Sequence, residues 1–346
     1  MPNIVLQTEA LTKQYGSLTA VNNLTIEVYE GEVFGFLGPN GAGKTTSINM
    51  MCGLLKPDAG RVLVRGVPMN NGAQDIRAQV GVCPQDIVLW ERLTCLEQLQ
   101  FIGQMYGLTA QTARQRSEQL LVELDLVEKR NKQARTLSGG MQRRLNLAMA
   151  LVHDPAIVVL DEPEAGLDPQ SRVKVRDYIK SLAHKKTVIL TTHNMDEADR
   201  VADRVAIIDH GQLLVLDTPQ TLKQRVGEGD VVEISLDTSL TDTQAGQLQA
   251  TLSALIAGVT VETERKLLSV HADANGMQAR LAAMVAEIKI EAQRSLLTVR
   301  ALNAVSALPA VLEKLADLGL HPGEVRVREN TLEDVFIQLT GRRLRG

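Results

Sequence analysis

Residues 38–45 read Gly-Pro-Asn-Gly-Ala-Gly-Lys-Thr and directly follow the apolar run Val-Phe-Gly-Phe-Leu of residues 33–37. A buried strand, a glycine-rich turn and a helix that begins near Lys44 form the context that a phosphate-binding loop requires. Glycines let backbone N–H groups converge on phosphate oxygens, while the helix N-terminus and Lys44 add positive charge. Thr45 offers a hydroxyl to Mg²⁺. The sequence therefore predicts an α/β sheet with phosphate contacts from Gly38, Pro39, Asn40, Gly41, Ala42, Gly43, Lys44, Thr45 and Thr46.

A second feature carries acidic side chains. Residues 157–162 read Ile-Val-Val-Leu-Asp-Glu, which predicts a central strand with two carboxylates at its C-terminal end, where α/β sheets bind ligands. Asp161 is placed to hold Mg²⁺ through water. Glu162 is then free to orient and deprotonate an attacking water molecule.

A third feature is the turn Leu-Ser-Gly-Gly-Met-Gln at residues 137–142, which opens a predicted helix over residues 141–151. Ser138 is its expected cap, and the two glycines expose backbone N–H groups that suit a phosphate. Taken by itself, the turn is best explained as a helix cap.

Composition limits the classes of function. A chain of 346 residues predicts two domains, and 3% aromatic residues with a net charge of −4 argue against nucleic-acid binding. Cys52, Cys83 and Cys95 form no C-x-x-C pair, so we expect small apolar residues in a reducing compartment. A run of about 18 apolar residues is lacking, which predicts a cytoplasmic chain whose membrane role comes through a partner.

The pattern along the chain predicts two domains of different character. Residues 1–222 alternate strands and helices, with extended segments at 4–9 and 24–28 and a helical subdomain at about 86–151. Within the subdomain, Thr94-x-x-Glu97 is a capping box and residues 110–126 form a helix. Residues 227–230 mark a linker, and residues 223–346 are interpreted as a smaller α+β domain with a helix at 304–318.

These motifs together resemble the ATP-binding cassette (ABC) proteins. The turn at 137–142 is similar to their signature motif, and the other motifs follow in the expected order over about residues 3–222. By this resemblance Tyr15 stacks on adenine, Gln85 is the Q-loop glutamine, and Asp168 of the D-loop crosses a dimer interface. His193 is the switch histidine that contacts the γ-phosphate. The resemblance assigns ATP binding to Tyr15, Gln85, Ser138, Gly139, Gly140, Gln142, Asp168 and the phosphate loop, catalysis to Lys44, Glu162 and His193, and metal binding to Thr45, Gln85 and Asp161.

The expected partners follow from the same features. One phosphate loop and one separate phosphate-binding turn per chain imply that Ser138 and Gly140 complete the ATP site of a second cassette, identical or related. We expect a dimer that closes on ATP with Mg²⁺ and opens after hydrolysis. Residues 327–341 resemble the end of daunorubicin-resistance-type cassettes, which serve bacterial ABC-2 exporters. This implies ABC-2-type transmembrane permease subunits and a peripheral position on the inner face of the membrane.

Two residues depart from the family pattern, and two other functions compete. Glu164 stands where Thr is common, outside the inner phosphate contacts, so we do not expect inactivation. Met149 stands where Arg is common, which predicts a weaker interface contact. The first competing function is a soluble ABC protein acting on ribosomes or DNA, and the second is a regulatory ATP-binding module with little turnover. Glu162 and His193 argue against the latter.

Overall fold

The computed structural model describes residues 3–69, 76, 78–226, 230–236, 260–264, 267–271, 285–291, 296–301, 304–317 and 319–341. The chain divides into two compact units, one of residues 1–219 with 339–346 and one of residues 220–338. Residues 227–229 of the predicted linker lie outside the described residues. In the described part of the chain, no helix is long and apolar enough to span a bilayer.

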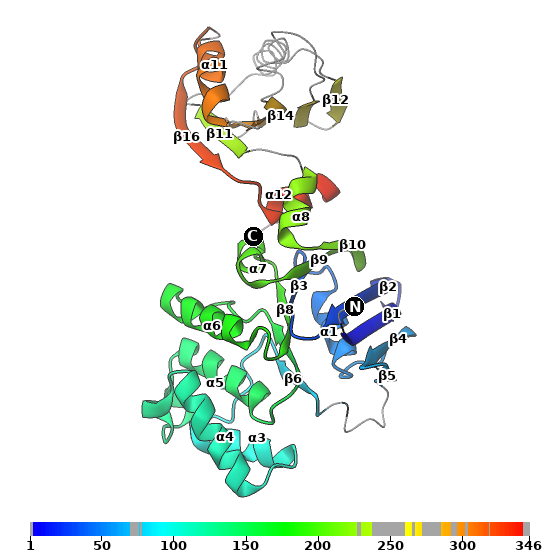
Figure 1. Cartoon of the computed structure of the whole chain (residues 1–346), viewed down its shortest axis with the longest axis vertical. Helices are drawn as coiled ribbons and strands as arrows, with labels where there is room; N and C mark the ends of the chain where they lie inside the picture. Colours follow the sequence, from blue (N-terminus) through cyan, green and yellow to red (C-terminus); the bar gives the residue numbers. More distant parts are fainter. Residues whose placement is uncertain are drawn as a thin grey trace. The chain divides into compact units, whose positions relative to one another are not determined.

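The first unit is built on a six-stranded sheet in the order β10-β9-β3-β8-β7-β6, in which only the pair β10–β9 is antiparallel (Figure 1). The strands are β3 (Val33–Leu37), β6 (Val80–Cys83), β7 (Ile157–Asp161), β8 (Thr187–Thr192), β9 (Arg204–Asp209) and β10 (Gln212–Asp217). Every residue of β3, β7 and β8 is buried, as expected for parallel strands covered on both faces. This confirms the predicted α/β sheet.

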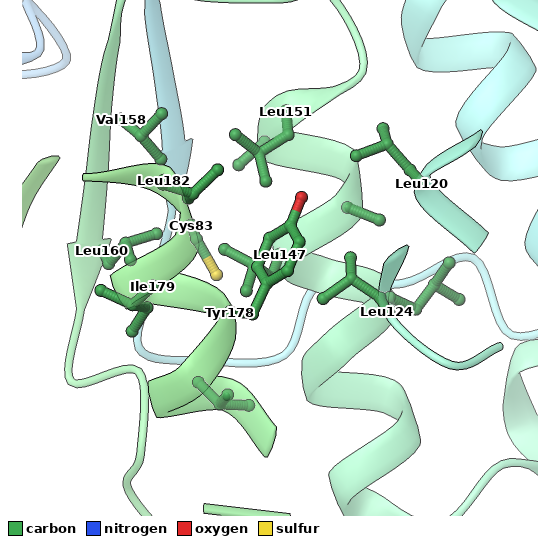
Figure 2. Packing of buried hydrophobic residues seen from close by; sticks show 14 of the residues in the cluster. Cys83, Leu120, Leu124, Leu147, Leu151, Val158, Leu160, Tyr178, Ile179 and Leu182 are labelled. Atoms are coloured by element: carbon green, nitrogen blue, oxygen red, sulfur yellow. The ribbon is translucent and has the colours of Figure 1, made fainter. Parts of the chain in front are cut away.

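Alternate residues of these strands face two separate cores. Val158 and Leu160 of β7 belong to a cluster with Leu147, Tyr178 and other side chains of the helices (Figure 2). Ile157 and Val159 belong to the other cluster, which includes Ile48 of α1. The three cysteines are buried and unpaired, so the prediction that they act as small apolar residues is confirmed. Because side chains pack on both faces of the sheet, the ends of its strands are held in fixed positions.

The helices of this unit are α1 (Lys44–Met51), α3 (Cys95–Met105), α4 (Ala110–Glu123), α5 (Gly139–Leu151), α6 (Pro169–Leu182) and α7 (Met195–Val201). Figure 1 shows α3, α4 and α5 gathered beside the sheet, where the helical subdomain was predicted. The capping box of Thr94 and Glu97 is present. The helix predicted over 110–126 ends early, because Asp125 adopts a left-handed φ of 56°.

A second, antiparallel sheet in the first unit has the order β2-β1-β4-β5, with β1 (Ile4–Tyr15), β2 (Leu18–Tyr29), β4 (Ala59–Val64) and β5 (Val67–Pro68). The first two strands are longer than the predicted 4–9 and 24–28. They continue to a tight turn at Gly16, whose φ is 59°. This extension brings the turn to the phosphate-binding loop.

The second unit contains an antiparallel sheet in the order β14-β15-β11-β16 and a separate β12–β13 hairpin. Its strands are β11 (Asp230–Leu236), β12 (Thr260–Glu264), β13 (Leu267–His271), β14 (Val285–Glu291), β15 (Leu296–Ala301) and β16 (Pro322–Arg328). Helix α11 (Ala304–Asp317) packs on β11, β15 and β16, which agrees with the predicted α+β class. The remaining helices are α8 (Pro219–Val226) and α12 (Leu332–Thr340). Strand β14 was not predicted.

Candidate active site

The phosphate-binding loop joins β3 to α1, and two of its glycines are required by the packing of the chain itself. Gly43 has a left-handed φ of 98°, and a Cβ there would lie 2.4 Å from the carbonyl oxygen of Ala20. A Cβ on Gly38 would lie 2.4 Å from the carbonyl oxygen of Ile208. Side chains at these positions would therefore displace the backbone of neighbouring segments as well as obstruct a phosphate.

Lys44 begins α1, and its ammonium group is buried within the loop. Nζ donates hydrogen bonds to the carbonyl oxygens of Gly38 (2.7 Å) and Pro39 (3.3 Å) and lies 3.5 Å from Oε1 of Glu162. Burial lowers the pKa of Lys44, and the carboxylate of Glu162 opposes that shift. The ammonium group is thus surrounded by oxygen acceptors whose place phosphate oxygens can take.

Asp161 and Glu162 lie at the end of β7, where the neighbouring parallel strand orients both. The register of β7 and β8 sets Asp161 opposite Thr191. The Thr191 hydroxyl donates to the Asp161 carboxylate and accepts from the backbone N–H of Glu162 at 3.0 Å. Oε2 of Glu162 lies 2.9 Å from Nδ1 of His193, which follows β8. The predicted base, metal ligand and switch histidine are therefore joined in one network.

A pocket of about 520 Å³ opens beside the loop. It contains ten of the predicted site residues, namely Tyr15, Pro39, Asn40, Gly41, Gly43, Lys44, Thr45, Thr46, Gln85 and Glu162. Five lining residues were not predicted, namely Leu18, Thr19, Ala20, His210 and Gly211. They come from the start of β2, next to the β1–β2 turn, and from the β9–β10 turn, and the N–H of Gly211 donates to the carbonyl oxygen of Ala42 at 2.9 Å. Only the tertiary fold brings these turns to the loop.

The signature residues lie elsewhere in the first unit, at the start of α5. Oγ of Ser138 accepts from the N–H of Met141 at 3.3 Å, which confirms the predicted cap. Gly140 packs on the start of α6, since a Cβ there would lie 2.1 Å from Oγ of Ser171. Asp168 caps α6 by accepting from the N–H of Ser171, and hydrogen bonds from the side chain and the backbone of Ser171 lower the pKa of Asp168. One chain therefore holds the signature turn and the D-loop together, apart from its own phosphate pocket.

Of the remaining signature residues, Gly139 is the first residue of α5, and Gln142 donates from Nε2 to the carbonyl oxygen of Ala134 at 3.0 Å. Both departures from the family pattern lie away from the pocket lining. Glu164 is buried and makes two hydrogen bonds to Arg176. Met149 is partly buried against the helical core cluster.

Comparison with known proteins decides the family. The model of the ABC transporter family matches residues 21–165. The daunorubicin resistance ATP-binding protein DrrA3 of Streptomyces coeruleorubidus is 36% identical over 343 residues, which cover 99% of this chain and 97% of that protein. The chain belongs to the ABC transporter family. As an ATP-binding protein of that family it carries the ATPase cassette, and the prediction from its motifs is confirmed.

Other relatives of this cassette are consistent with the assignment. The Nod factor export ATP-binding protein I of Ralstonia nicotianae is 43% identical over 231 residues, covering 66% of this chain and 72% of that protein. A solved ATP-binding subunit of an ABC transporter is 27% identical and covers 64% of this chain and 92% of its own, with a TM-score of 0.59. A dimeric cassette with bound ADP and Pi, in a post-hydrolysis state, is 27% identical over 62% of this chain and 98% of its own, with a TM-score of 0.57.

Proposed function

We propose that this chain is the ATP-hydrolysing subunit of a bacterial ABC-2-type exporter and works as a pair of cassettes. The observation that carries the proposal is the position of Glu162. Its carboxylate lines the phosphate pocket with one oxygen 3.5 Å from Lys44 Nζ and the other 2.9 Å from His193 Nδ1. A carboxylate so placed is suited to accept a proton from a water molecule that attacks a phosphate.

The residues of the loop have separate roles in this reaction. Backbone N–H groups of residues 40–45 bind the β- and γ-phosphates at the N-terminus of α1. Lys44 exchanges its carbonyl acceptors for phosphate oxygens. Thr45 and Gln85 line the pocket with the hard oxygen donors that Mg²⁺ prefers, and the buried Asp161 at the end of β7 offers a further carboxylate. When bound, Mg²⁺ would offset the negative charge of the phosphates.

The cassette pairs with a second copy or a related chain. The exposed Ser138 and Gly139 and the buried Gly140 form the N-terminus of α5, and none of them lines this chain's own pocket. In the proposed dimer, this turn contacts the γ-phosphate held by the partner, and Asp168 lies at the interface. The dimeric relative with bound ADP and Pi supports the pairing of two cassettes.

The membrane subunits would dock beside the Q-loop, on the cytoplasmic face of the membrane. Large apolar side chains are exposed there on the segment after Gln85 and on α3, namely Ile87, Val88, Trp90, Phe101 and Met105. The rings of Trp90 and Phe101 meet edge to face at 5.3 Å. Names of relatives that refer to daunorubicin resistance and Nod factor export support transport out of the cell.

The second domain, residues 223–346, is proposed to have an accessory or dimer-stabilising role. Its described residues hold no group of three His, Cys, Asp or Glu side chains that could bind a metal. A chain truncated after Val226 tests this role. Unchanged ATP turnover and unchanged dimerisation in the truncated chain would refute it.

Glu162→Gln tests the function as a whole. The variant should still bind ATP, since Lys44 and the loop are intact, but steady-state hydrolysis should fall by about 10²–10⁴-fold. ATP binding is measured by calorimetry, hydrolysis by phosphate release, and dimerisation by size-exclusion chromatography with ATP. We expect an ATP-bound dimer to accumulate. Turnover close to that of the unsubstituted protein would refute the role of Glu162.

A further inference from the structure

Arg143, on the second turn of α5, uses its whole guanidinium group to bind the backbone of the active site. The side chain is buried, with 3% of the residue exposed. Nε donates one hydrogen bond of 3.1 Å, Nη1 donates two of 2.7 and 2.9 Å, and Nη2 donates two of 2.7 Å. The five acceptors are the carbonyl oxygens of Pro84, Gln85, Asp161, Glu162 and Pro163. A guanidinium group has five N–H donors, so all of them are satisfied.

These carbonyl groups belong to two loops that the sheet brings together. Residues 84–85 follow β6 and residues 161–163 lie at the end of β7, and the two strands are parallel neighbours with Cys83 opposite Leu160. Arg143 therefore fastens both loops to α5. Because it binds only their backbone, the side chains of Gln85 and Glu162 stay available to the pocket that they line.

The backbone at Glu162 needs such support. Its φ of 47° lies in the left-handed region, which costs a residue with a side chain about 1–3 kcal/mol. Thr191 holds the N–H of Glu162, and Arg143 holds its carbonyl oxygen at 2.7 Å. Both sides of the residue are thereby fixed, and the carboxylate is aimed at Lys44 and His193.

We propose that Arg143 is a positioning residue that holds Gln85 and Glu162 in the geometry for hydrolysis and couples the Q-loop to the signature helix. This inference rests on the proposed ATPase function. When a membrane subunit displaces residues 84–85, the rigid, planar guanidinium group of Arg143 transmits the movement to Glu162. Lysine cannot replace it, because three donors on one nitrogen cannot reach five acceptors on two loops.

The adjacent Arg144 offers a matched control. It lies on the same helix with 5% of the residue exposed, and it donates to the carbonyl oxygens of Leu124 and Asp125 in the helical subdomain. Arg144→Lys therefore disturbs a buried arginine of α5 without touching either loop of the site. Arg143→Lys should lower kcat by about 10- to 100-fold, since small displacements of catalytic groups have effects of this size. ATP affinity by calorimetry should change by less than about twofold.

The experiment uses the full chain and compares kcat, ATP affinity and thermal unfolding of the two variants. Trp90, the single tryptophan, lies five residues after Gln85 and gives an independent signal for the Q-loop segment. ATP should alter its fluorescence in the unsubstituted protein and in Arg144→Lys, and should not in Arg143→Lys. Arg143→Gln, which reaches one loop only, should give the same result, and it replaces the lysine variant if that chain does not fold.

Normal kcat in Arg143→Lys would overturn the proposal. Equal losses of kcat in Arg143→Lys and Arg144→Lys, in proportion to lost folded protein, would also overturn it, because Arg143 would then have a purely structural role. A different result would show that the proposed function itself is wrong, because Glu162→Gln would then hydrolyse ATP at the normal rate.

Discussion

Glu164, where the family commonly has threonine, forms a buried ion pair whose removal has a calculable cost. Its carboxylate accepts from Nε and Nη2 of Arg176 at 3.0 and 2.6 Å, and the two side chains are 4% and 14% exposed. Loss of one partner of a buried pair costs about 3–5 kcal/mol, because the other charge stays buried without compensation. We therefore expect Glu164→Gln to lower the free energy of unfolding of the first unit.

A second carboxylate reduces this cost. Burial and the charge of Glu164 raise the pKa of Glu197, and Glu197 also acts electrostatically on Arg176. Removal of Glu164 relieves the repulsion and leaves Glu197 to stabilise the guanidinium group. The expected loss is therefore at the lower end, about 3 kcal/mol. Urea unfolding followed by Trp90 fluorescence measures it in the first unit alone, because that unit contains the tryptophan.

A double-mutant cycle separates the pair from its surroundings. Arg176→Met leaves Glu164 buried without its cation and should cost at least as much as Glu164→Gln. The double variant Glu164→Gln with Arg176→Met should cost less than Arg176→Met alone, because no unpaired charge of the pair remains. Hydrolysis per folded molecule should stay within about twofold in Glu164→Gln, since Glu164 does not line the pocket. A cost below about 1 kcal/mol for both single variants would refute the reasoning.

Three further results are expected. Lys44→Ala should lose ATP affinity in calorimetry, because the loop loses its full positive charge; unchanged affinity would place the nucleotide elsewhere. Burial lowers the pKa of His153 from 6.5 to about 4. The stabilising contribution of the buried neutral imidazole is therefore present above pH 6.5 and is lost as the pH falls through 4. In His153→Phe, which retains the stacking on Tyr106, the free energy of unfolding in urea should change less between pH 4 and 6.5 than in the unsubstituted protein. The difference should be about 1–2 kcal/mol, which allows for the partial exposure of the side chain. The same pH dependence in both proteins would contradict this. Phe336→Asp, at a residue 1% exposed, should cost about 3–5 kcal/mol in thermal unfolding while Leu339→Asp, 46% exposed, should not; equal effects would show that burial does not decide the outcome.

Local patterns predicted the centre of the site, while contacts between distant segments could not be predicted. The loop at 38–45 and the pair Asp161–Glu162 each combine a strand with adjacent functional residues, so a short stretch of sequence suffices. Thr191 binds Asp161 only because β8 lies beside β7 in one register. Nothing in the isolated sequence fixes that register.

Arg143 shows the same limit more sharply. The sequence contains two adjacent arginines after the signature turn, and neither charge nor spacing tells which one faces the active site. Residues 143 and 144 point to different sides of a helix because successive residues are about 100° apart. Its acceptors are carbonyl groups, which every residue type carries. A pattern of residue types therefore cannot reveal this contact.

Strand ends in the second unit and at the N-terminus follow a related rule. Alternation of Ile288 and Ile290 with charged residues is typical of a strand, and β14 is completed by its antiparallel pairing with β15. Similarly, β1 and β2 continue through polar residues to Gly16 because each hydrogen-bonds to the other. Pairing, more than composition, sets where these strands end.

The ion pair between Lys44 and Glu162 gives the proposed reaction an order. In the structure Lys44 divides its donors between two carbonyl groups of the loop and the carboxylate of Glu162. Phosphates of ATP bind in the same loop and compete for that ammonium group with more negative charge than one carboxylate carries. Binding therefore draws Lys44 away from Glu162, while Arg143 and Thr191 keep the backbone of Glu162 in place. The Glu162 carboxylate is then free to hydrogen-bond the attacking water molecule only after the substrate is bound.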